Sequence, residues 1–269
     1  MSGQIDWGRP VQRIVSKDNP TFKALRALGN ELAEIRAQRS AVLAGAHLIQ
    51  SCLQSGHTLR QVLLAPSAAG NAEVGGLLAA LSNVPALELA EALFKEVVQL
   101  VTPTGIAAVI DLPAIADDQP VGDAVLLDAI QDAGNVGTLL RTAAAAGFND
   151  VILGNGCAGA WTAKVLRAAQ GAHFSLRIRE QVDLPVWIRH CQQPVLGAVA
   201  AEGTSLYQIS LLEPHIWVFG NEGAGISPAV ESTLRQRVTI SMAEGSESLN
   251  VSAAAAVCLF EARRQRLAV

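Results

Sequence analysis

Two kinds of apolar spacing alternate along the second half of the chain. Short continuous apolar runs, typical of strands buried in a parallel sheet, are separated by segments with the spacing of amphipathic helices. The runs cover residues 125–130, 151–153, 174–178, 195–200, 216–219 and 238–242. The helical segments cover residues 135–146, 161–169, 184–191, 228–235 and 249–266. This alternation predicts an α/β domain with a mostly parallel sheet and helices on both of its faces.

The first half of the chain predicts a smaller α/β unit. Asn19 followed by Pro20 is a typical start of a helix, which we expect to run to residue 31. The other expected elements are helices over residues 44–55, 72–81 and 90–100, and strands over residues 59–65, 86–89 and 106–111. Residues 113–122 contain two prolines and two aspartates, so we expect a linker there. The predicted domains are therefore residues 1–112 and 123–269.

The composition fits two folded domains in the cytoplasm. Half of the 269 residues are apolar and 16% are charged, so each domain can bury a core. The polar first ten residues argue against a secretory signal, and charged residues interrupt the long apolar regions, which argues against a membrane span. The four cysteines form no CxxC pair, so we expect reduced thiols and no metal site. They are Cys52, Cys157, Cys191 and Cys258.

Charge is distributed unevenly along the chain. The net charge is −4, which does not by itself indicate nucleic-acid binding. Residues 1–60 carry eight basic and four acidic residues, whereas residues 61–135 carry one basic and ten acidic residues. A basic amino-terminal arm can contact phosphates, but an ordinary solvated face gives the same pattern. Charge alone therefore leaves both interpretations open.

Three short polar or glycine-rich stretches each follow an apolar run and precede a helix. They are Asn135-Val136-Gly137-Thr138-Leu139-Leu140-Arg141, Phe219-Gly220-Asn221-Glu222-Gly223-Ala224-Gly225-Ile226 and Ser248-Leu249-Asn250-Val251-Ser252. Open α/β sheets bind their ligands at the carboxyl ends of strands, which is where these stretches fall. We therefore expect the three stretches to converge on one site.

The first and third stretches allow a structural interpretation beside a functional one. Asn135 can cap the helix that follows it, and Ser248 can cap the last helix. Arg141 lies almost two turns into its helix, where a long cationic side chain can reach a phosphate or a ribose hydroxyl. Asn250 and Ser252 are polar residues in the first turn of the last helix. From these residues alone, capping and ligand binding both remain open.

The second stretch points more strongly to a function. Gly220, Gly223 and Gly225 flank Glu222 directly after an apolar run. Glycines at this density let the backbone approach a ligand closely and expose N–H and C=O groups that can bind an adenine or a ribose. Glu222 is either an exposed turn residue or a functional carboxylate, and its glycine neighbours favour the second interpretation.

A different glycine pattern suggests a nucleotide cofactor. The segment from Gly154 to Gly159 fits GxGxxG, and Asp183 lies at a suitable distance for a ribose partner. The pattern does not open the first strand–helix turn of its domain, however, and its third glycine precedes the helix. A glycine-rich bend is therefore favoured over an NAD(P) site.

Taken in order, the three stretches resemble the signature motifs of the SpoU–TrmH branch of the SPOUT RNA methyltransferases. That family's pattern is Asn-x-Gly-x-x-x-Arg, then Gly-x-Glu-x-x-Gly, then Ser-Leu-Asn-Val-Ser, and every key residue is present. The resemblance covers roughly residues 122–269. Arg39 and the sequence Gly45-Ala46-His47-Leu48 resemble the amino-terminal RNA-binding domain of the same family.

The resemblance implies a deep trefoil knot near the carboxyl end, bound S-adenosylmethionine, a homodimer and 2′-O-methylation of ribose in structured RNA. The residues implied to hold the cofactor are Gly220, Asn221, Ile240, Leu249 and the strand end from Ala198 to Ala200. The implied catalytic residues are Asn135, Arg141, Glu222, Ser248 and Asn250, with Arg141 supplied across the dimer. RNA contacts are expected from Arg141, Arg167, Arg39 and Arg13. The chain departs from the family at Ala169, where a serine is usual.

Methyl transfer from a sulfonium needs in-line positioning and removal of the 2′-hydroxyl proton. The three motifs contain no histidine, and the guanidinium of Arg141 resists deprotonation. We therefore expect Arg141 to bind a phosphate and stabilise the developing alkoxide, while a water, the phosphate or Glu222 takes the proton. Ribosomal RNA is the preferred substrate. A tRNA 2′-O-methyltransferase and a non-catalytic RNA-binding homologue are the alternatives, and an NAD(P)-binding enzyme is the least favoured.

Overall fold

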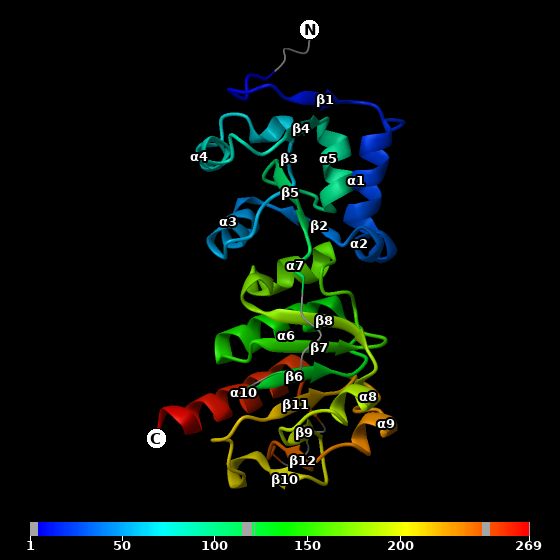
Figure 1. Cartoon of the computed structure of the whole chain (residues 1–269), viewed down its shortest axis with the longest axis vertical. Helices are drawn as coiled ribbons and strands as arrows, with labels where there is room; N and C mark the ends of the chain where they lie inside the picture. Colours follow the sequence, from blue (N-terminus) through cyan, green and yellow to red (C-terminus); the bar gives the residue numbers. More distant parts are fainter. Residues whose placement is uncertain (1–4, 115–119, 121, 244–247, 269) are drawn as a thin grey trace. The chain divides into compact units, whose positions relative to one another are not determined.

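The computed structural model describes residues 5–114, 120, 122–243 and 248–268. These residues form two compact units (Figure 1), and each is described by itself below. The first unit comprises residues up to 114 together with residues 161–166, and the second comprises the remainder. Most of the predicted linker lies outside the described residues.

The first unit is built around a five-stranded sheet with the strand order β1-β4-β3-β5-β2. β5 runs antiparallel to β2 and β3, and the other neighbouring strands are parallel. Helices α1, α2 and α5 lie on one side of this sheet and α3 and α4 on the other (Figure 1). The strands are β1 (Gln12–Ile14), β2 (Ser40–Ala44), β3 (Gln61–Leu64), β4 (Ala86–Leu89) and β5 (Ile106–Asp111). The helices are α1 (Pro20–Asn30), α2 (Leu32–Gln38), α3 (Ala46–Gln54), the short η1 (Pro66–Ala68), α4 (Ala72–Ala80) and α5 (Glu91–Val98).

Local chemistry sets the ends of two helices in this unit. The Asn19 side chain accepts hydrogen bonds from the backbone N–H groups of Thr21 and Phe22, so the predicted N-cap of α1 is confirmed. α3 begins at Ala46, two residues later than predicted, because Gly45 adopts a φ of 97° that separates it from β2. The sequence pattern does not predict β1, α2 or β2.

The second unit contains a seven-stranded sheet in the order β10-β12-β9-β11-β6-β7-β8, and every neighbouring pair is parallel. The strands are β6 (Ala124–Leu127), β7 (Asp150–Gly154), β8 (Arg177–Val182), β9 (Val195–Ala198), β10 (Thr204–Ser205), β11 (Ile216–Phe219) and β12 (Gln236–Thr239). The helices are α6 (Ala133–Ala146), η2 (Ala172–Ser175), α8 (Leu184–Ile188), η3 (Leu206–Gln208), α9 (Pro228–Glu231) and α10 (Val251–Leu267). A further helix, α7 (Ala163–Ala169), is divided, since its residues 163–166 are assigned to the first unit. The predicted α/β class with a mostly parallel sheet is confirmed.

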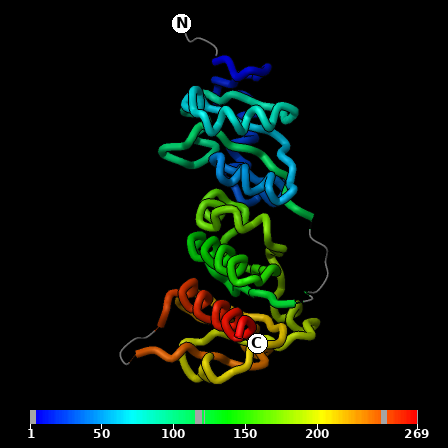
Figure 2. The backbone as a smooth tube through the Cα atoms, turned by 90° about the vertical axis from the view of Figure 1, so that its left-hand side faces the viewer, coloured from blue at the N-terminus to red at the C-terminus, as the bar shows by residue number. Residues whose placement is uncertain are grey.

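Helices cover both faces of the seven-stranded sheet. α6 and α10 pack side by side, as seen in the ribbon of Figure 1 and in the tube of Figure 2, where α6 is green and α10 is red. α8 and α9 contact one another on the other face, where Leu184 and Val230 pack against Leu126 and Val218 of the central strands. All four residues of β6 and all four of β11 are buried, which explains why these strands read as continuous apolar runs.

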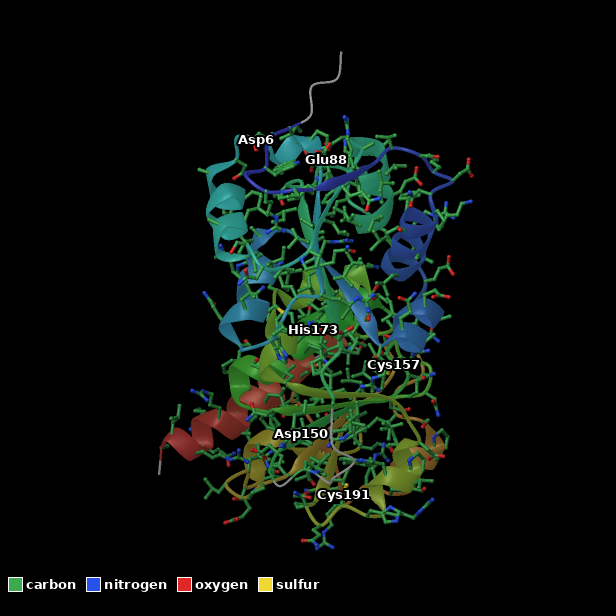
Figure 3. The ribbon with its side chains drawn as sticks, turned by 45° about the horizontal axis from the view of Figure 1, so that its top comes forward. Asp6, Glu88, Asp150, Cys157, His173 and Cys191 are labelled. Carbon is green, nitrogen blue, oxygen red and sulfur yellow. The ribbon has the colours of Figure 1, made fainter. Side chains whose placement is uncertain are left out.

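One predicted strand of the second unit is wrong in position. Residues 174–178 were expected to be extended, but the segment begins as the 3-10 helix η2, and β8 starts at Arg177. β8 carries charged residues because it is an edge strand of the sheet. Its Arg177 and Arg179 side chains donate to the buried carboxylate of Asp150, the latter over 3.0 Å. Asp150 is labelled in Figure 3. The sequence analysis identified strands by continuous apolar runs, so it misplaced this strand, which carries Arg177 and Arg179.

The four cysteines are free thiols, and burial raises the pKa of each. Two of them, Cys157 and Cys191, are labelled in Figure 3. A raised pKa keeps these side chains in the unreactive thiol form at neutral pH. Within the described residues, no three His, Cys, Asp or Glu side chains come together in an arrangement that could hold a metal ion. None of the helices formed by those residues has the length and apolar character needed to cross a membrane.

Candidate functional site

The structure brings the three polar stretches together at one edge of the seven-stranded sheet. The stretches follow β6, β11 and β12, and the carboxyl ends of these strands lie at the same edge because the whole sheet is parallel. β6 and β11 are direct neighbours, and β9 separates β11 from β12. Three loops from separate parts of the chain can therefore build a single site.

Hydrogen bonds connect one side chain from each stretch. The Asn135 side chain donates from Nδ2 to Oε1 of Glu222 over 2.8 Å. Asn250 donates from its own Nδ2 to Oδ1 of Asn135 over 3.2 Å. Asn135 is thus the central residue of a polar network that spans all three stretches. The network holds the Glu222 carboxylate, although the side chains lie at the surface.

Neither of the two residues that the sequence offered as possible helix caps, Asn135 and Ser248, caps its helix. α6 is capped by Asp132, whose carboxylate accepts the backbone N–H of Asn135 over 2.8 Å. Asn135 therefore lies in the first turn, and its side chain is free to face Glu222. α10 is capped by Asn250 rather than by Ser248, because Oδ1 of Asn250 accepts the backbone N–H of Ser252. Asn250 both caps the helix and donates to Asn135.

The glycine-rich stretch forms a tight turn between β11 and α9. The backbones of Asn221 and Gly225 exchange two hydrogen bonds of 2.9 Å. A Cβ atom added to Gly220 would lie 2.3 Å from Ile226 N and from the carbonyl carbon of Gly225, so only glycine fits there. The Asn221 side chain serves the same turn, since it accepts from two backbone N–H groups and donates to the carbonyl of Ala129. Both polar atoms of the Asn221 side chain therefore form hydrogen bonds within the protein.

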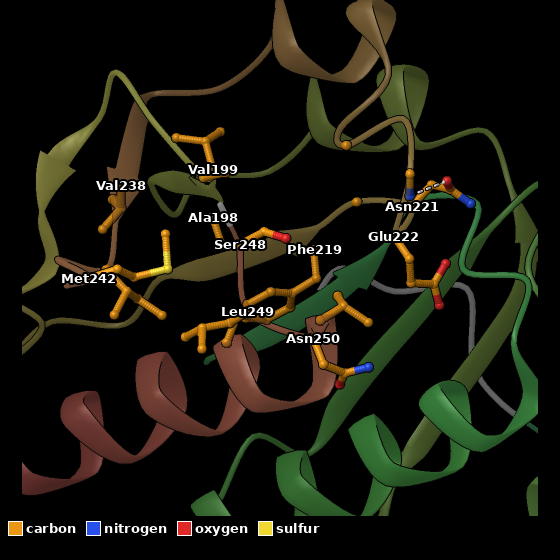
Figure 4. A pocket seen from close by; sticks show the side chains of 17 residues that line it. Ala198, Val199, Phe219, Asn221, Glu222, Val238, Met242, Ser248, Leu249 and Asn250 are labelled. Atoms are coloured by element: carbon orange, nitrogen blue, oxygen red, sulfur yellow. Dashed lines mark hydrogen bonds between the residues drawn. The ribbon is translucent and has the colours of Figure 1, made fainter. Parts of the chain in front are cut away.

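A cavity of about 370 Å³ opens beside this turn (Figure 4). The cavity is lined by the glycine turn, by the ends of β9, β11 and β12 and by the start of α10. Its lining residues are Ala198, Val199, Ala200, Phe219, Gly220, Asn221, Glu222, Gly223, Gly225, Val238, Ile240, Met242, Ser248, Leu249, Asn250, Val251 and Ala254. All residues that the sequence assigned to the cofactor are among them. The sequence analysis missed Phe219, Val238, Met242, Val251 and Ala254, although all five lie within or next to the segments that it singled out.

The wall of the cavity is largely apolar, and one of its described residues has an ionisable side chain. Glu222 supplies the carboxylate, and no lysine, arginine or histidine is among the lining residues. The remaining polar groups are the side chains of Asn221, Ser248 and Asn250 and the exposed backbone of the turn. This arrangement suits a flat, mostly apolar ligand that carries a positive charge.

Arg141 does not line this cavity. It is exposed on α6, six residues beyond Asn135, and so lies about 9 Å along the helix and about 120° around it. It makes no hydrogen bond or ion pair with any residue that the structure describes. Its guanidinium is therefore available to a partner outside the fold of its own unit.

The other predicted RNA-binding arginines have diverse surroundings. Arg13 forms an ion pair of 3.0 Å with the buried carboxylate of Glu88, so part of its charge is already matched within the first unit. Arg39 is exposed at the left-handed carboxyl end of α2 and donates to the carbonyl of Pro113 over 3.4 Å. Arg167 is partly buried near the end of α7. None of these three residues lines the cavity.

The GxGxxG pattern has a structural explanation. An added Cβ at Gly154 would lie 2.7 Å from the Leu184 side chain, and Gly156 adopts a φ of 84°. α7 begins only at Ala163, well after the third glycine. Asp183, the candidate ribose partner, instead caps α8 by accepting the backbone N–H of Val186. These residues therefore form a bend and a helix cap, as the favoured interpretation of the sequence expects.

Comparisons with known proteins agree with this geometry. The sequence model of the SpoU rRNA Methylase family matches residues 123–260. The 23S rRNA (guanosine(2553)-2′-O)-methyltransferase RlmP of Bacillus subtilis is 31% identical over 258 residues, which cover 94% of this chain and 100% of that protein. The crystal structure of an RNA 2′-O ribose methyltransferase is 30% identical, with a TM-score of 0.79 over 95% of this chain and 100% of that one.

A structure with bound cofactor is also similar. The AdoMet-bound rRNA methyltransferase from Sinorhizobium meliloti is 25% identical, with a TM-score of 0.80, and the likeness covers 94% of this chain and 98% of that one. The likeness thus extends over nearly the full length of each protein, including the first unit. By its fold, its three converging motifs and these matches, the chain belongs to the SpoU rRNA methylase family.

Proposed function

We propose that this protein transfers a methyl group from S-adenosylmethionine to a ribose 2′-hydroxyl of ribosomal RNA. The observation that carries the proposal is the network of Asn135, Glu222 and Asn250 at the mouth of a largely apolar cavity. The relative RlmP, similar over its whole length, is named as a 23S rRNA 2′-O-methyltransferase, which supports rRNA over tRNA as the substrate. The S. meliloti neighbour is named as AdoMet-bound, which supports the cofactor.

The cavity fits S-adenosylmethionine on its own chemistry. Its volume of about 370 Å³ lies within the range of small-molecule sites. Apolar side chains such as Leu249 and Ile240 suit an adenine ring, and the glycine turn offers backbone groups at a point where a side chain would be excluded. Glu222 provides a negative charge for the sulfonium, and none of the described lining residues is a cation that would repel it. Gly220, Ile240, Leu249 and Ala200 are the residues that we expect to hold the adenosine.

When bound, S-adenosylmethionine supplies an electrophilic methyl group whose departure leaves a neutral thioether. The chain's own residues must then orient the ribose and accept the hydroxyl proton. Among the described residues that line the cavity, Glu222 alone carries a carboxylate. Asn135 donates to its Oε1, which leaves Oε2 available to the ribose hydroxyl. The guanidinium of Arg141 binds a phosphate of the target nucleotide. Ser248 and Asn250 complete the polar rim that orients the ribose.

We infer that the active protein is a homodimer in which Arg141 of one copy serves the cavity of the other. Arg141 is exposed and lies away from the cavity of its own chain. Phe260 and Leu267 of α10 are large apolar side chains that are 46% and 75% exposed, which favours a contact with another copy. Two inactive variants, Arg141→Ala and Glu222→Gln, should regain about a quarter of wild-type activity when they are mixed and allowed to exchange subunits. No recovery in mixed dimers would contradict this arrangement.

We also propose that the carboxyl-terminal segment is knotted, as in the SPOUT fold. Two observations support this proposal: β12 lies between β9 and β10 in the sheet, and α10 packs against α6, which comes more than a hundred residues earlier in the chain. The connection through residues 244–247 lies outside the described residues. A crystal structure should show that the chain between β12 and α10 passes through a loop formed by an earlier part of the second unit. A path around the outside of that loop would contradict the proposal.

The RNA contacts of the first unit are a separate part of the proposal. Arg39 is exposed, whereas Arg13 is paired with Glu88, so we expect Arg39 to contribute more to phosphate binding. We also propose that the protein acts in the cytoplasm, because its relative RlmP comes from a bacterium, Bacillus subtilis, in which ribosomal RNA lies in the cytoplasm.

The experiment that tests the proposed function maps 2′-O-methylated nucleotides in RNA from cells with and without this protein. Loss of the protein should remove one or a few 2′-O-methyl groups from ribosomal RNA, and the wild-type chain, but not Arg141→Ala, should restore them. An unchanged rRNA pattern with a lost methyl group in tRNA would instead support the tRNA alternative. No change in either RNA would contradict the proposal.

A further inference from the structure

Ser252 lies beneath the polar network and is not one of the residues at the cavity. It is in the first turn of α10, and only 7% of its surface is exposed. Its hydroxyl lies 3.2 Å from Oδ1 and 3.3 Å from the backbone carbonyl of Asn135. A buried hydroxyl that is aimed at a residue of another helix has a specific role, either in packing or in orientation.

The hydroxyl is not needed to cap or stabilise its own helix. Asn250 already caps α10 with its side-chain oxygen. Serine and threonine inside helices commonly donate to the carbonyl four residues earlier, as Ser51 and Thr138 do in this chain. At Ser252 the corresponding residue, Ser248, precedes the helix, and the hydroxyl turns to Asn135 instead.

The hydrogen bonds around Ser252 have a direction that can be followed to Glu222. The backbone N–H of Ser252 can only donate, and it donates to Oδ1 of Asn250 over 2.9 Å. Asn250 must then present its Nδ2 to Asn135, whose Oδ1 receives it. Because that oxygen is occupied, Asn135 presents its own Nδ2 to Glu222. The backbone N–H of Ser252 thus determines the orientation of the Asn250 side-chain amide and, through it, that of Asn135.

A reversed Asn135 amide would be disfavoured on both of its sides. Its oxygen would lie 2.8 Å from a carboxylate oxygen of Glu222, so two acceptors would face each other. Its nitrogen would face the amide nitrogen of Asn250, which is also a donor. The Ser252 hydroxyl adds a second donor on the side where Oδ1 now lies. The amide of Asn135 is therefore locked in the orientation that holds Glu222.

We propose that Ser252 is a positioning residue for methyl transfer. Its hydroxyl, together with its backbone N–H, fixes the side-chain orientation of Asn135 and thereby fixes the Glu222 carboxylate with Oε2 facing the ribose. Ser252 touches neither substrate nor cofactor and acts through Asn135 alone. The inference rests on the proposed function for its catalytic consequence, whereas the orientation of Asn135 can be measured without any reaction.

The kinetic test compares Ser252→Ala and Ser252→Thr with Ser232→Ala. Ser232 is a matched control because its exposed hydroxyl donates to a backbone carbonyl over 2.9 Å in α9, away from the network. Methyl transfer to in vitro transcribed 23S rRNA is measured at saturating S-adenosylmethionine. Ser252→Ala should lower kcat about threefold to tenfold, the effect of one lost hydrogen bond, while KM for RNA changes less than about twofold. Ser252→Thr should restore kcat, and Ser232→Ala should match the wild type.

The structural test uses the side-chain amide protons of Asn135 in ¹⁵N-labelled protein, assigned by their loss in Asn135→Asp. Ser252→Ala should shift and broaden this resonance, whereas Ser232→Ala should leave it in place. Unchanged kcat, a change confined to KM, or a lower kcat with an unchanged Asn135 resonance would each overturn the proposal. If the wild type methylates no rRNA although the resonance responds as expected, the proposed function fails and the orientation of Asn135 by Ser252 stands.

Discussion

Gly220→Ala is the substitution whose effect follows most directly from the geometry of the cavity. The added Cβ would lie 2.3 Å from the carbonyl carbon of Gly225, 2.3 Å from Ile226 N and 2.4 Å from the Gly225 carbonyl oxygen. All three are backbone atoms, so no side chain can rotate away to make room. The turn is closed by paired hydrogen bonds between Asn221 and Gly225, which resist the required movement.

The size of the effect can be worked out from these distances. Ordinary contact begins near 3.4 Å, so the backbone of residues 225–226 must move by roughly 1 Å. Forcing a methyl group into a packed site costs about 1–3 kcal/mol. The turn forms a wall of the cavity, so most of this strain should appear in ligand binding and the rest in the free energy of unfolding. We expect Kd for S-adenosylmethionine to rise about tenfold to a hundredfold.

Isothermal titration with S-adenosylmethionine measures this change, and Gly223→Ala provides the comparison. An added Cβ at Gly223 meets only the Asn221 side chain, at an ordinary 3.6 Å, and we expect its Kd to rise less than about threefold. Circular dichroism would show that both variants are folded. If Gly220→Ala binds S-adenosylmethionine as tightly as the wild type, the glycine turn is not a wall of the cofactor site.

Three further predictions concern charge and hydrogen bonding. Arg141→Ala should abolish methyl transfer but leave Kd for S-adenosylmethionine within about twofold of the wild type, because the side chain lies away from the cavity; wild-type turnover would refute its role. In a double-mutant cycle on the free energy of unfolding, Asn135→Ala and Glu222→Gln should couple by about 1 kcal/mol, a value reduced by their exposure to solvent, and additive losses would contradict the network. Burial lowers the pKa of His173 from 6.5 to about 4. The unfolded chain therefore takes up this proton first, and the free energy of unfolding should fall by about 3 kcal/mol between pH 6.5 and pH 4. His173→Gln should flatten that part of the pH profile in urea denaturation, and an equally steep profile would assign the effect to other groups.

The sequence predicted the sheet of the second unit well because its strands are buried on both faces. β6 and β11 are wholly buried, and their continuous apolar runs have few other interpretations. β2 shows the opposite case, since Ser40–Ala44 is short and rich in residues that fit a helix equally well. Its antiparallel pairing with β5, more than sixty residues away, decides its structure, and such long-range pairing leaves no local signal.

The sequence singles out polar and glycine residues that the structure places around one cavity, but it does not predict the hydrogen bonds between them. The glycines, Glu222 and the two asparagines carry their chemistry in the sequence. Which of several polar residues caps a helix depends on where the helix begins, and Asp132 takes the cap position for which Asn135 was also a candidate. Ser252 lay in the third motif without an assigned role, because only the packing of α10 against α6 shows that its hydroxyl faces Asn135.

The central claim is that the three motifs form a ribose 2′-O-methyltransferase site that uses S-adenosylmethionine. It is tested most directly by incubating the purified protein with in vitro transcribed 23S rRNA and S-adenosylmethionine that carries a deuterated methyl group. The RNA is then digested to nucleosides and analysed by mass spectrometry. The account predicts a labelled 2′-O-methylnucleoside with the wild type and none with Glu222→Gln or Arg141→Ala. A label on a base, or no label in any nucleoside, would contradict it.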